Sequence, residues 1–141
     1  ALPISATTIA KNCYNSMFKD CTSLTAAPSL PATTLVESCY QQMFYGCTSL
    51  TTAPDLPATT LVSYCYNNMF YGCSKLNAIK CLATAVADNS YWPVQDWLSG
   101  VAATGTFTKS TSASEGFWTT TEESNFGTGI PGGWTVNTAS E

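Results

Sequence analysis

The chain repeats itself with a period of 26 residues. Residues 30–50, LPATTLVESCYQQMFYGCTSL, return almost letter for letter as residues 56–76, LPATTLVSYCYNNMFYGCSKL. A weaker copy, ATTIAKNCYNSMFKDCTSL, occupies residues 6–24. Apolar landmarks keep strict register through the copies: Cys13, Cys39, Cys65; Met17, Met43, Met69; Phe18, Phe44, Phe70; Cys21, Cys47, Cys73; Leu24, Leu50, Leu76. Such a period is typical of a solenoid, in which each unit buries its apolar face only by stacking on its neighbours.

Each repeat divides into an extended part and a part with the pattern of a helix. Residues 50–57 carry apolar side chains at intervals of three, with a proline on either side of Asp55, which predicts a short strand. Pro54 cannot donate a hydrogen bond, so we expect a bulge or the strand end there. Residues 61–72 then predict a helix, because Leu61, Cys65, Met69 and Cys73 recur every four residues as one buried stripe, with Phe70 beside them.

Both ends of this expected helix carry suitable residues. Thr34 and Thr60 stand where N-caps belong, and Glu37 follows Thr34 at the spacing of a capping box. Gly46 and Gly72 stand where a left-handed residue would end the helix, with Asp20 as a poorer substitute in the first copy. Strand and helix together predict a parallel sheet on one side of the stack and short helices on the other.

The frame LxxAPxLPATTLxxxCYxxMFxGCxxL resembles the BspA-like leucine-rich repeats of bacterial cell-surface proteins, whose unit runs LxxIxLPxxVxxIxxxAFxGCxxL. The resemblance extends from residue 6 to about residue 82, although the unit here is longer and carries a second cysteine. It implies an α/β leucine-rich-repeat solenoid of about three 26-residue units, built from short parallel strands and short helices, with a β-rich C-terminal cap. That family is associated with surface display, adhesion to host proteins and bacterial coaggregation, and the resemblance implies no particular ligand.

The repeat pattern fades at both ends. We assign residues 1–87 to the repeat array and residues 88–141 to a C-terminal capping segment. In that segment Pro93 predicts the start of a helix through Val94, Trp97 and Leu98 to Gly100, followed by β-like stretches at residues 104–109, 116–121 and 133–136.

At the N-terminus the chain opens inside a repeat, which predicts a processed product or a fragment of something longer. Residues 1–9 offer only a degraded copy with Leu2, Ile4 and Ile9 as apolar positions. We therefore expect this end to be covered by upstream repeats or by another copy, and in the second case self-association would propagate as a filament.

Composition excludes several classes of protein. Charged residues make up only 10% of the chain and the net charge is −4, with five lysines and no arginine. Nucleic-acid binding requires clustered cations, which this chain lacks. No apolar run is long enough to span a membrane. With serine and threonine supplying most of the polarity, this composition predicts a secreted or cell-surface protein. The resemblance to BspA-like repeats implies that the surface is that of a bacterium.

The cysteines and the missing histidine bear on chemistry. The seven cysteines lie eight and eighteen residues apart in the repeats, which is not a metal-site spacing, and there is no histidine to complete a metal site or a catalytic triad. Cys39 and Cys47 would be about 12 Å apart on one helix, too far for a disulfide. Between repeats, both reduced core cysteines and a disulfide remain open. We therefore predict no catalytic residue, no cofactor, no metal and no enzyme activity.

Function follows from the expected surface. The outward strand positions form a possible binding face: Thr25, Ser29, Thr51, Asp55, Asn77 and Lys80. We predict a non-enzymatic binding or adhesion module for a protein or glycan ligand, with two alternatives. One is a structural segment of an extracellular fibre that assembles by repeat stacking. The other is a carbohydrate-binding module that uses the tyrosine rows Tyr14, Tyr40, Tyr66 and Tyr45, Tyr71, although these rows are also expected simply to pack, with their hydroxyls in water.

Overall fold

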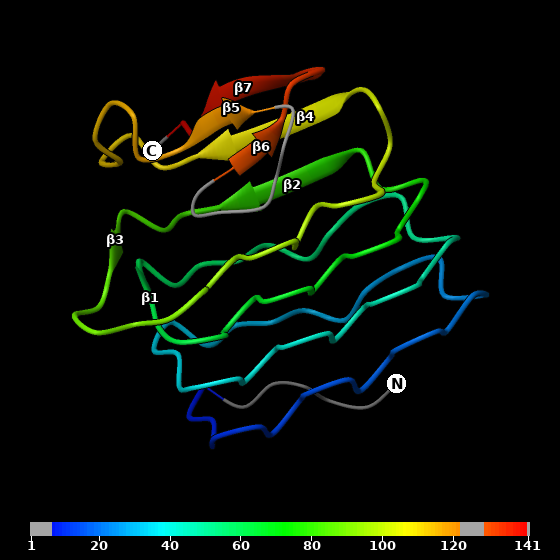
Figure 1. Ribbon diagram of the computed structural model, residues 1–141, viewed down its shortest axis with the longest axis horizontal. Coiled ribbons are helices and arrows are strands. Elements are labelled where there is room, and N and C mark those ends of the chain that lie inside the picture. The colour runs from blue at the N-terminus through cyan, green and yellow to red at the C-terminus, as the bar shows by residue number, and fades with distance from the viewer. Residues whose placement is uncertain (1–6, 122–128, 141) are drawn as a thin grey trace.

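The computed structural model of this chain describes residues 7–121 and 129–140. The repeats form successive coils of one stack, with the first described repeat at one end and strand β7 at the other (Figure 1). These described residues contain seven short strands: β1 (Thr60–Leu61), β2 (Ala78–Cys81), β3 (Ala85–Val86), β4 (Gly105–Lys109), β5 (Thr119–Thr121), β6 (Gly129–Pro131) and β7 (Trp134–Thr138).

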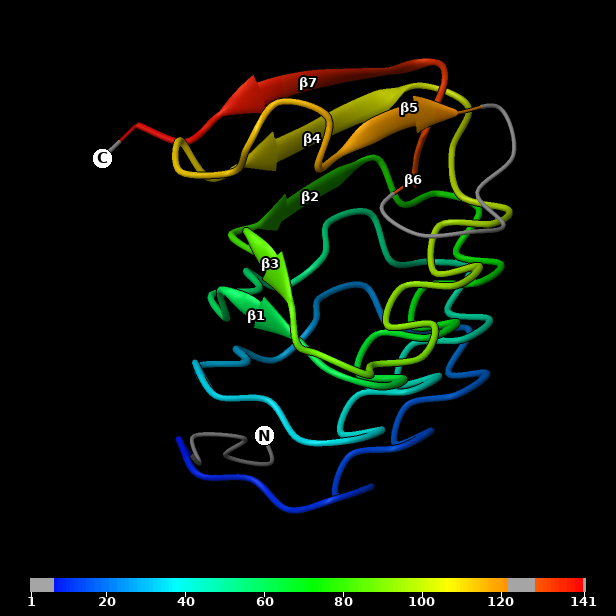
Figure 2. The same cartoon turned by 60° about the vertical axis from the view of Figure 1, so that its left-hand side comes forward.

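All strand pairs in the described residues are parallel. The largest sheet has the order β2-β4-β7, and the pairs β1-β3 and β5-β6 form two smaller sheets (Figure 2). The second coil joins β2 through the bridges Thr52↔Ala78 and Leu56↔Cys81. Between these bridges the second coil has one residue more than β2, which is a bulge at Pro54–Asp55. The bulge or strand end expected at Pro54 is therefore confirmed.

The predicted helices are wrong, and with them the α/β class of the fold. Residues 7–121 and 129–140 contain strands, turns and bends but no helix. Where the helix was expected, the chain forms a run of tight turns, for example Cys39 N–H to Val36 O at 3.2 Å and Met43 N–H to Tyr40 O at 3.1 Å. An α-helix would bond each N–H to the carbonyl four residues back. We call the four such stretches, residues 10–21, 36–47, 62–73 and 90–100, the turn segments. The first to fourth coils are the coils that contain these segments, in this order.

Between these local bonds, every second N–H of the first three turn segments donates to the next coil. In the second coil Tyr40 N–H reaches Cys65 O at 3.1 Å, and Phe44 N–H reaches Met69 O at 2.9 Å. The same pattern continues from the third coil, where Phe70 N–H donates to Trp97 O at 3.0 Å. The turn segments are thus held by alternating local and inter-coil hydrogen bonds.

The backbone itself explains why the pattern resembled a helix. Every fourth residue of a turn segment has a left-handed φ, at Ser38 (56°), Gln42 (55°) and Gly46 (73°) in the second coil. This gives a conformational period of four, whereas an α-helix has 3.6 residues per turn. Apolar residues spaced by four therefore stay on one face without drifting. Gly46 and Gly72 are left-handed as expected, but each closes a turn, and Thr34 and Thr60 cap nothing.

The core consists of columns of identical side chains. Phe18, Phe44 and Phe70 stack with ring centroids 5.6 Å apart, and Tyr14, Tyr40 and Tyr66 stack at 5.7 and 6.2 Å. All seven cysteines are free, so neither ladder of repeated cysteines is bridged. Cys47 and Cys73 donate their S–H to Phe18 O (3.1 Å) and Phe44 O (3.0 Å) of the preceding coil, and behave as small core residues.

The C-terminal part of the chain continues the stack after the repeat sequence has faded. Residues 90–100 accept hydrogen bonds from the third coil as a further turn segment, with Gly72 N–H to Ser99 O at 2.8 Å. The helix expected after Pro93 is wrong for the same reason as the others. The β-like stretches expected in this part contain β4 and β5 and the first three residues of β7, which continues to Thr138. Hydrogen bonds cross the expected boundary after residue 87, and that boundary remains a prediction.

The first described coil exposes residues whose counterparts in later coils are buried. Met17 is 41% exposed and Cys13 and Cys21 are exposed, whereas their counterparts in the second and third coils are buried. The apolar positions Leu2 and Ile4, which we expected to lie at this end, fall outside the described residues.

The phenylalanine column gives a stability prediction. Phe44 is fully buried between two identical rings, so Phe44→Ala should lower the free energy of unfolding by about 3–5 kcal/mol. Because coils are coupled to their nearest neighbours, residues of the first and third coils should loosen too. Phe18→Ala is the matched control, since Phe18 is half-buried and has one stacking partner. Urea unfolding measures both, and a cost for Phe44→Ala below about 1 kcal/mol, or equal to that of Phe18→Ala, would contradict this packing.

Candidate binding face on the strand side

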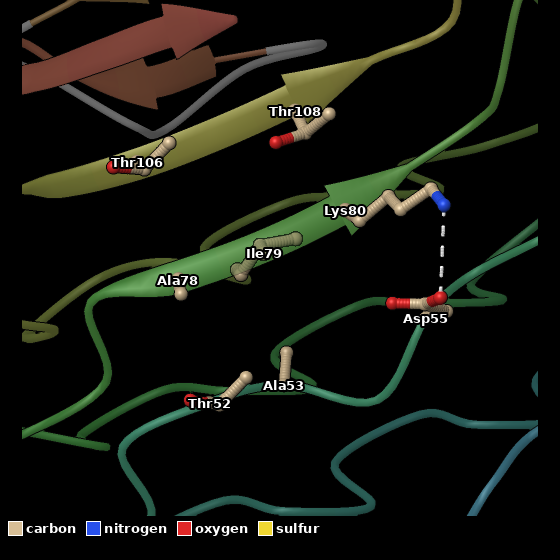
Figure 3. Close-up of a pocket in the computed structure, with 8 residues that line it drawn as sticks. All are labelled: Thr52, Ala53, Asp55, Ala78, Ile79, Lys80, Thr106 and Thr108. Atoms are coloured by element: carbon tan, nitrogen blue, oxygen red, sulfur yellow. Dashed lines mark ion pairs between the residues drawn. The ribbon is translucent and has the colours of Figure 1, made fainter. Parts of the chain in front are cut away.

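The outer side of β2 and β4 carries a shallow groove, which we call the strand face. It is lined by residues of three successive coils: Thr52, Ala53, Asp55, Ala78, Ile79, Lys80, Thr106 and Thr108 (Figure 3). In β2 the buried Ile79 points into the core, so Ala78 and Lys80 on either side of it point outward. The parallel register places Thr106 beside Ala78 and Thr108 beside Lys80.

This geometry brings together two of the six residues predicted for the binding face. Asp55 stands on the bulge beside Pro54, and its carboxylate lies 3.8 Å from the Lys80 ammonium. Both side chains are substantially exposed, at 73% and 42%, so the ion pair stabilises the fold by at most about 1 kcal/mol. Because the two charges cancel, the strand face is close to neutral. Because the pair is exposed, Asp55 and Lys80 can each exchange this contact for one with a ligand.

The other four predicted residues lie outside the groove. Thr51 and Asn77 are exposed at the start of their strand segments, where Asn77 N–H donates to Thr51 O at 3.0 Å. Thr25 and Ser29 are exposed on the first coil. Sequence reasoning missed Thr52, Thr106 and Thr108. Alternation with the buried Phe107 would have found the two threonines of β4, but only the strand register shows that they adjoin β2.

The size of the groove limits what it can bind. Its volume is about 130 Å³. Pockets that enclose a small molecule are usually about 300–1,000 Å³. A second hollow, lined by Thr33, Thr34, Leu35, Thr59, Thr60 and Val62, is also below that range at about 260 Å³. These surfaces suit a ligand that lies across several strands better than one that is enclosed.

The buried thiols are poor candidates for nucleophiles. Burial raises the pKa of Cys39 and of Cys47 from 9 to about 11, and the pKa of Cys73 and of Cys81 to about 12. A thiol attacks as its thiolate, which such pKa values make scarce at neutral pH. Among residues 7–121 and 129–140, no group of three or more potential metal ligands comes together.

The tyrosine rows lie differently from each other. Tyr40 and Tyr66 are buried inside the stack, and the Tyr40 hydroxyl has no hydrogen-bond partner, so the expectation that these hydroxyls reach water is wrong. Tyr45 and Tyr71 stack near the surface at 4.8 Å, with the Lys19 ammonium 4.7 Å from the Tyr45 ring. Only this second row is placed to touch a ligand.

Comparison with known proteins gives no relative: no family model, no curated protein and no solved structure matches this chain. Within the described part of the chain, no helix is of the length and apolarity needed to cross a membrane.

The buried thiols predict both a reactivity pattern and a pH dependence. At pH 8 a thiol reagent should modify Cys13 and Cys21 quickly and the five buried cysteines only after unfolding. Because burial raises the folded pKa above the unfolded value of 9, the unfolded state loses thiol protons first as pH rises. Stability should therefore be unaffected by these thiols below about pH 8 and fall between pH 9 and 11, by about 1.4 kcal/mol per pH unit for each thiol ionised only when unfolded.

Thiol titration and urea unfolding at pH 7, 9 and 10 test this pattern. The double variant Cys13→Ser, Cys21→Ser is the control and should show no fast thiol. Rapid modification of all seven cysteines in the folded chain, or stability that does not change up to pH 10, would contradict the burial described here.

Proposed function

We propose that the chain is a non-enzymatic binding module that holds an extended protein ligand on its strand face. The observation that carries this proposal is the parallel register of β2 and β4, which aligns outward side chains of successive coils in rows about 4.8 Å apart. A rigid, shallow, nearly neutral surface of this kind offers hydroxyl groups and one exchangeable ion pair to a ligand that crosses the strands. Because the groove is too small to enclose a small molecule, it favours a macromolecular ligand over a metabolite.

An extracellular or bacterial-surface location belongs to the same proposal. The low charge, the hydroxyl-rich surface and the resemblance of the repeat to surface-protein repeats support it. The free cysteines are compatible with an oxidising environment because five of the seven are buried, where oxidants do not reach them.

The test compares binding by matched variants. The purified chain is screened against extracellular-matrix proteins and partner-cell surface extracts, and a bound protein is then titrated. The variant Thr106→Arg, Thr108→Arg crowds the strand face with bulk and charge and should weaken binding at least tenfold. The control Thr33→Arg, Thr59→Arg places the same change on the other hollow and should bind like the wild type. Equal binding by the wild type and both variants would show that the ligand does not bind at the strand face.

A second candidate function is supported by the open first coil. Among the described residues, no N–H of another coil reaches the carbonyls of Lys11, Cys13, Asn15, Met17 and Lys19, whereas their counterparts in the second coil all accept such a bond. Met17 of the same turn segment is exposed. The first coil therefore offers both hydrogen-bond acceptors and an apolar side chain to a further coil. It favours a structural role in which copies associate end to end.

Light scattering under reducing conditions tests this second role. The mass of the wild type should rise above 15.0 kDa with concentration, and Met17→Lys should stay monomeric because it places a charge on the apolar end. A wild type that remains a monomer at the highest concentration would contradict end-to-end association.

A further inference from the structure

One corner of the coil changes its chemistry along the stack. The same left-handed position is occupied by Asn12 (φ 58°), Ser38 (56°), Tyr64 (56°) and Trp92 (43°) in the four turn segments. Asparagine is among the side chains that tolerate this conformation, whereas a bulky side chain there is an outlier. The first two coils thus carry small polar residues at this corner, and the last two carry aromatic residues that the backbone disfavours.

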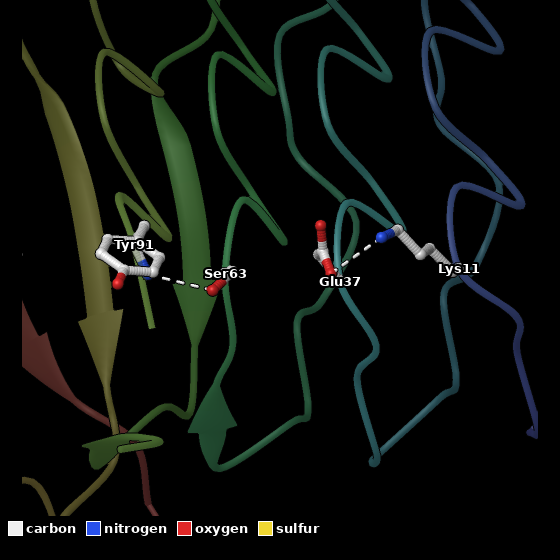
Figure 4. A network of polar contacts seen from close by, with 4 residues as sticks. All are labelled: Lys11, Glu37, Ser63 and Tyr91. Carbon is white, nitrogen blue, oxygen red and sulfur yellow. Dashed lines mark hydrogen bonds and ion pairs between the residues drawn. The ribbon is translucent and has the colours of Figure 1, made fainter. Parts of the chain in front are cut away.

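The position just before this corner changes in the same direction. Lys11 and Glu37 form an ion pair at 3.0 Å, and the next two coils place Ser63 and Tyr91 at the same height (Figure 4). The charges at one end of this row are therefore paired with each other. The other end is uncharged and aromatic.

Tyr64, Tyr91 and Trp92 form what we call the aromatic corner. Tyr91 is 63% exposed and Trp92 is 49% exposed, and the Trp92 ring stands edge-on to Tyr64 with centroids 6.1 Å apart and planes 70° apart. The two rings therefore contact each other edge to face, and Tyr91 and Trp92 present apolar ring surface to solvent. The exposed rings contribute little to the core, so core packing does not account for their presence.

Hydrogen bonds hold the backbone of this corner in place. Tyr91 N–H donates to the Ser63 hydroxyl at 3.0 Å (Figure 4), and Tyr64 N–H donates to Tyr91 O at 3.0 Å. The Asn67 side-chain amide, which is buried, donates to Trp92 O at 3.4 Å. The backbone that carries the rings is therefore fixed, so it need not be ordered when a ligand binds.

We propose that the aromatic corner binds a neutral sugar ring of a glycan. A pyranose has apolar C–H faces and a rim of hydroxyl groups, so it can lie against an aromatic wall while its hydroxyls stay in water. The chain has a net charge of −4 and the corner itself has no cation, which disfavours phosphorylated and nucleic-acid ligands.

The size of the corner decides between a sugar and a protein. A whole aromatic side chain buries about 150–250 Å², so two half-exposed rings and an edge offer roughly 200 Å². A stable protein partner needs about 800 Å² on each side. The corner fits one or two sugar rings, and it lies on turn segments rather than on the strand face, so this site is independent of the function proposed above.

Variants that restore the residues of the earlier coils give a sharp test. Trp92→Asn and Tyr64→Ser place at the corner the residue types that occupy it in the first and second coils. Each should keep or raise the midpoint of urea unfolding, because the backbone strain is relieved, and each should lose sugar binding at least tenfold. Tyr91→Ser, which copies Ser63, is a third variant that does not change a left-handed residue. Val136→Ser, at an exposed apolar residue of β7 away from the corner, is the control and should bind normally.

The probe is an array of neutral oligosaccharides that covers hexose and N-acetylhexosamine chains, followed by tryptophan-fluorescence titration with the oligosaccharide that is retained. Retention of at least one of them by the folded wild type, with loss in the corner variants alone, is the expected result. No retention by the folded wild type would overturn the proposal. So would retention that survives Trp92→Asn, or corner variants that bind normally and are less stable, since the rings would then have only a structural role.

Discussion

The fold depends on the way the turn segments divide their backbone N–H groups between two destinations. One N–H closes a local turn, as from Met43 to Tyr40 O, and the next donates to the following coil, as from Phe44 to Met69 O. A single repeat in isolation would leave half of these donors and the matching carbonyls without protein partners, so the repeat cannot bury them away from water until a neighbouring coil pairs them. Stacking is therefore required by the backbone as well as by the apolar side chains. In the part of the chain that the structure describes, the carbonyls of the first coil that no other coil reaches are the direct consequence at the end of the stack.

Columns of like side chains follow from this register. Because each coil sits directly on the next, Asn15, Gln41, Asn67 and Gln95 form an amide ladder, in which each side-chain N–H₂ donates to the oxygen of the next at 3.1, 3.3 and 3.4 Å. The phenylalanine and tyrosine columns follow the same rule. A slip by one residue would break the amide ladder and the aromatic columns, so the side chains fix the register that the backbone bonds require. The aromatic corner lies on the same framework, where a small polar residue would be easier to accommodate.

The sequence predicted the stack, its core positions and the special backbone sites better than it predicted the conformation between them. Met43, Phe44 and Cys47 are buried as their recurrence indicated, and Gly46 is left-handed as expected. The helix was wrong because apolar residues four apart fit both a helix and a backbone of period four, and only the inter-coil bonds distinguish the two. The fourth turn segment was predicted as a helix of a separate cap, because its side chains no longer resemble the repeat. At the strand face, Asp55 and Lys80 were predicted. Thr106 and Thr108 were not, because they adjoin β2 only through the pairing of β2 with β4, which does not follow the 26-residue repeat.

The central claim is that the N–H groups of Tyr40, Phe44, Tyr66 and Phe70 bind the carbonyl of another coil rather than one four residues back. Scalar couplings across hydrogen bonds, measured by NMR on the labelled chain, report such pairs directly. The account predicts couplings from the amide nitrogens of Tyr40 and Phe44 to the carbonyl carbons of Cys65 and Met69. It also predicts no coupling from Phe44 to Tyr40, since that carbonyl accepts from Met43. Couplings from each amide to the residue four places back, through residues 36–47 and 62–73, would show a helix and contradict the account.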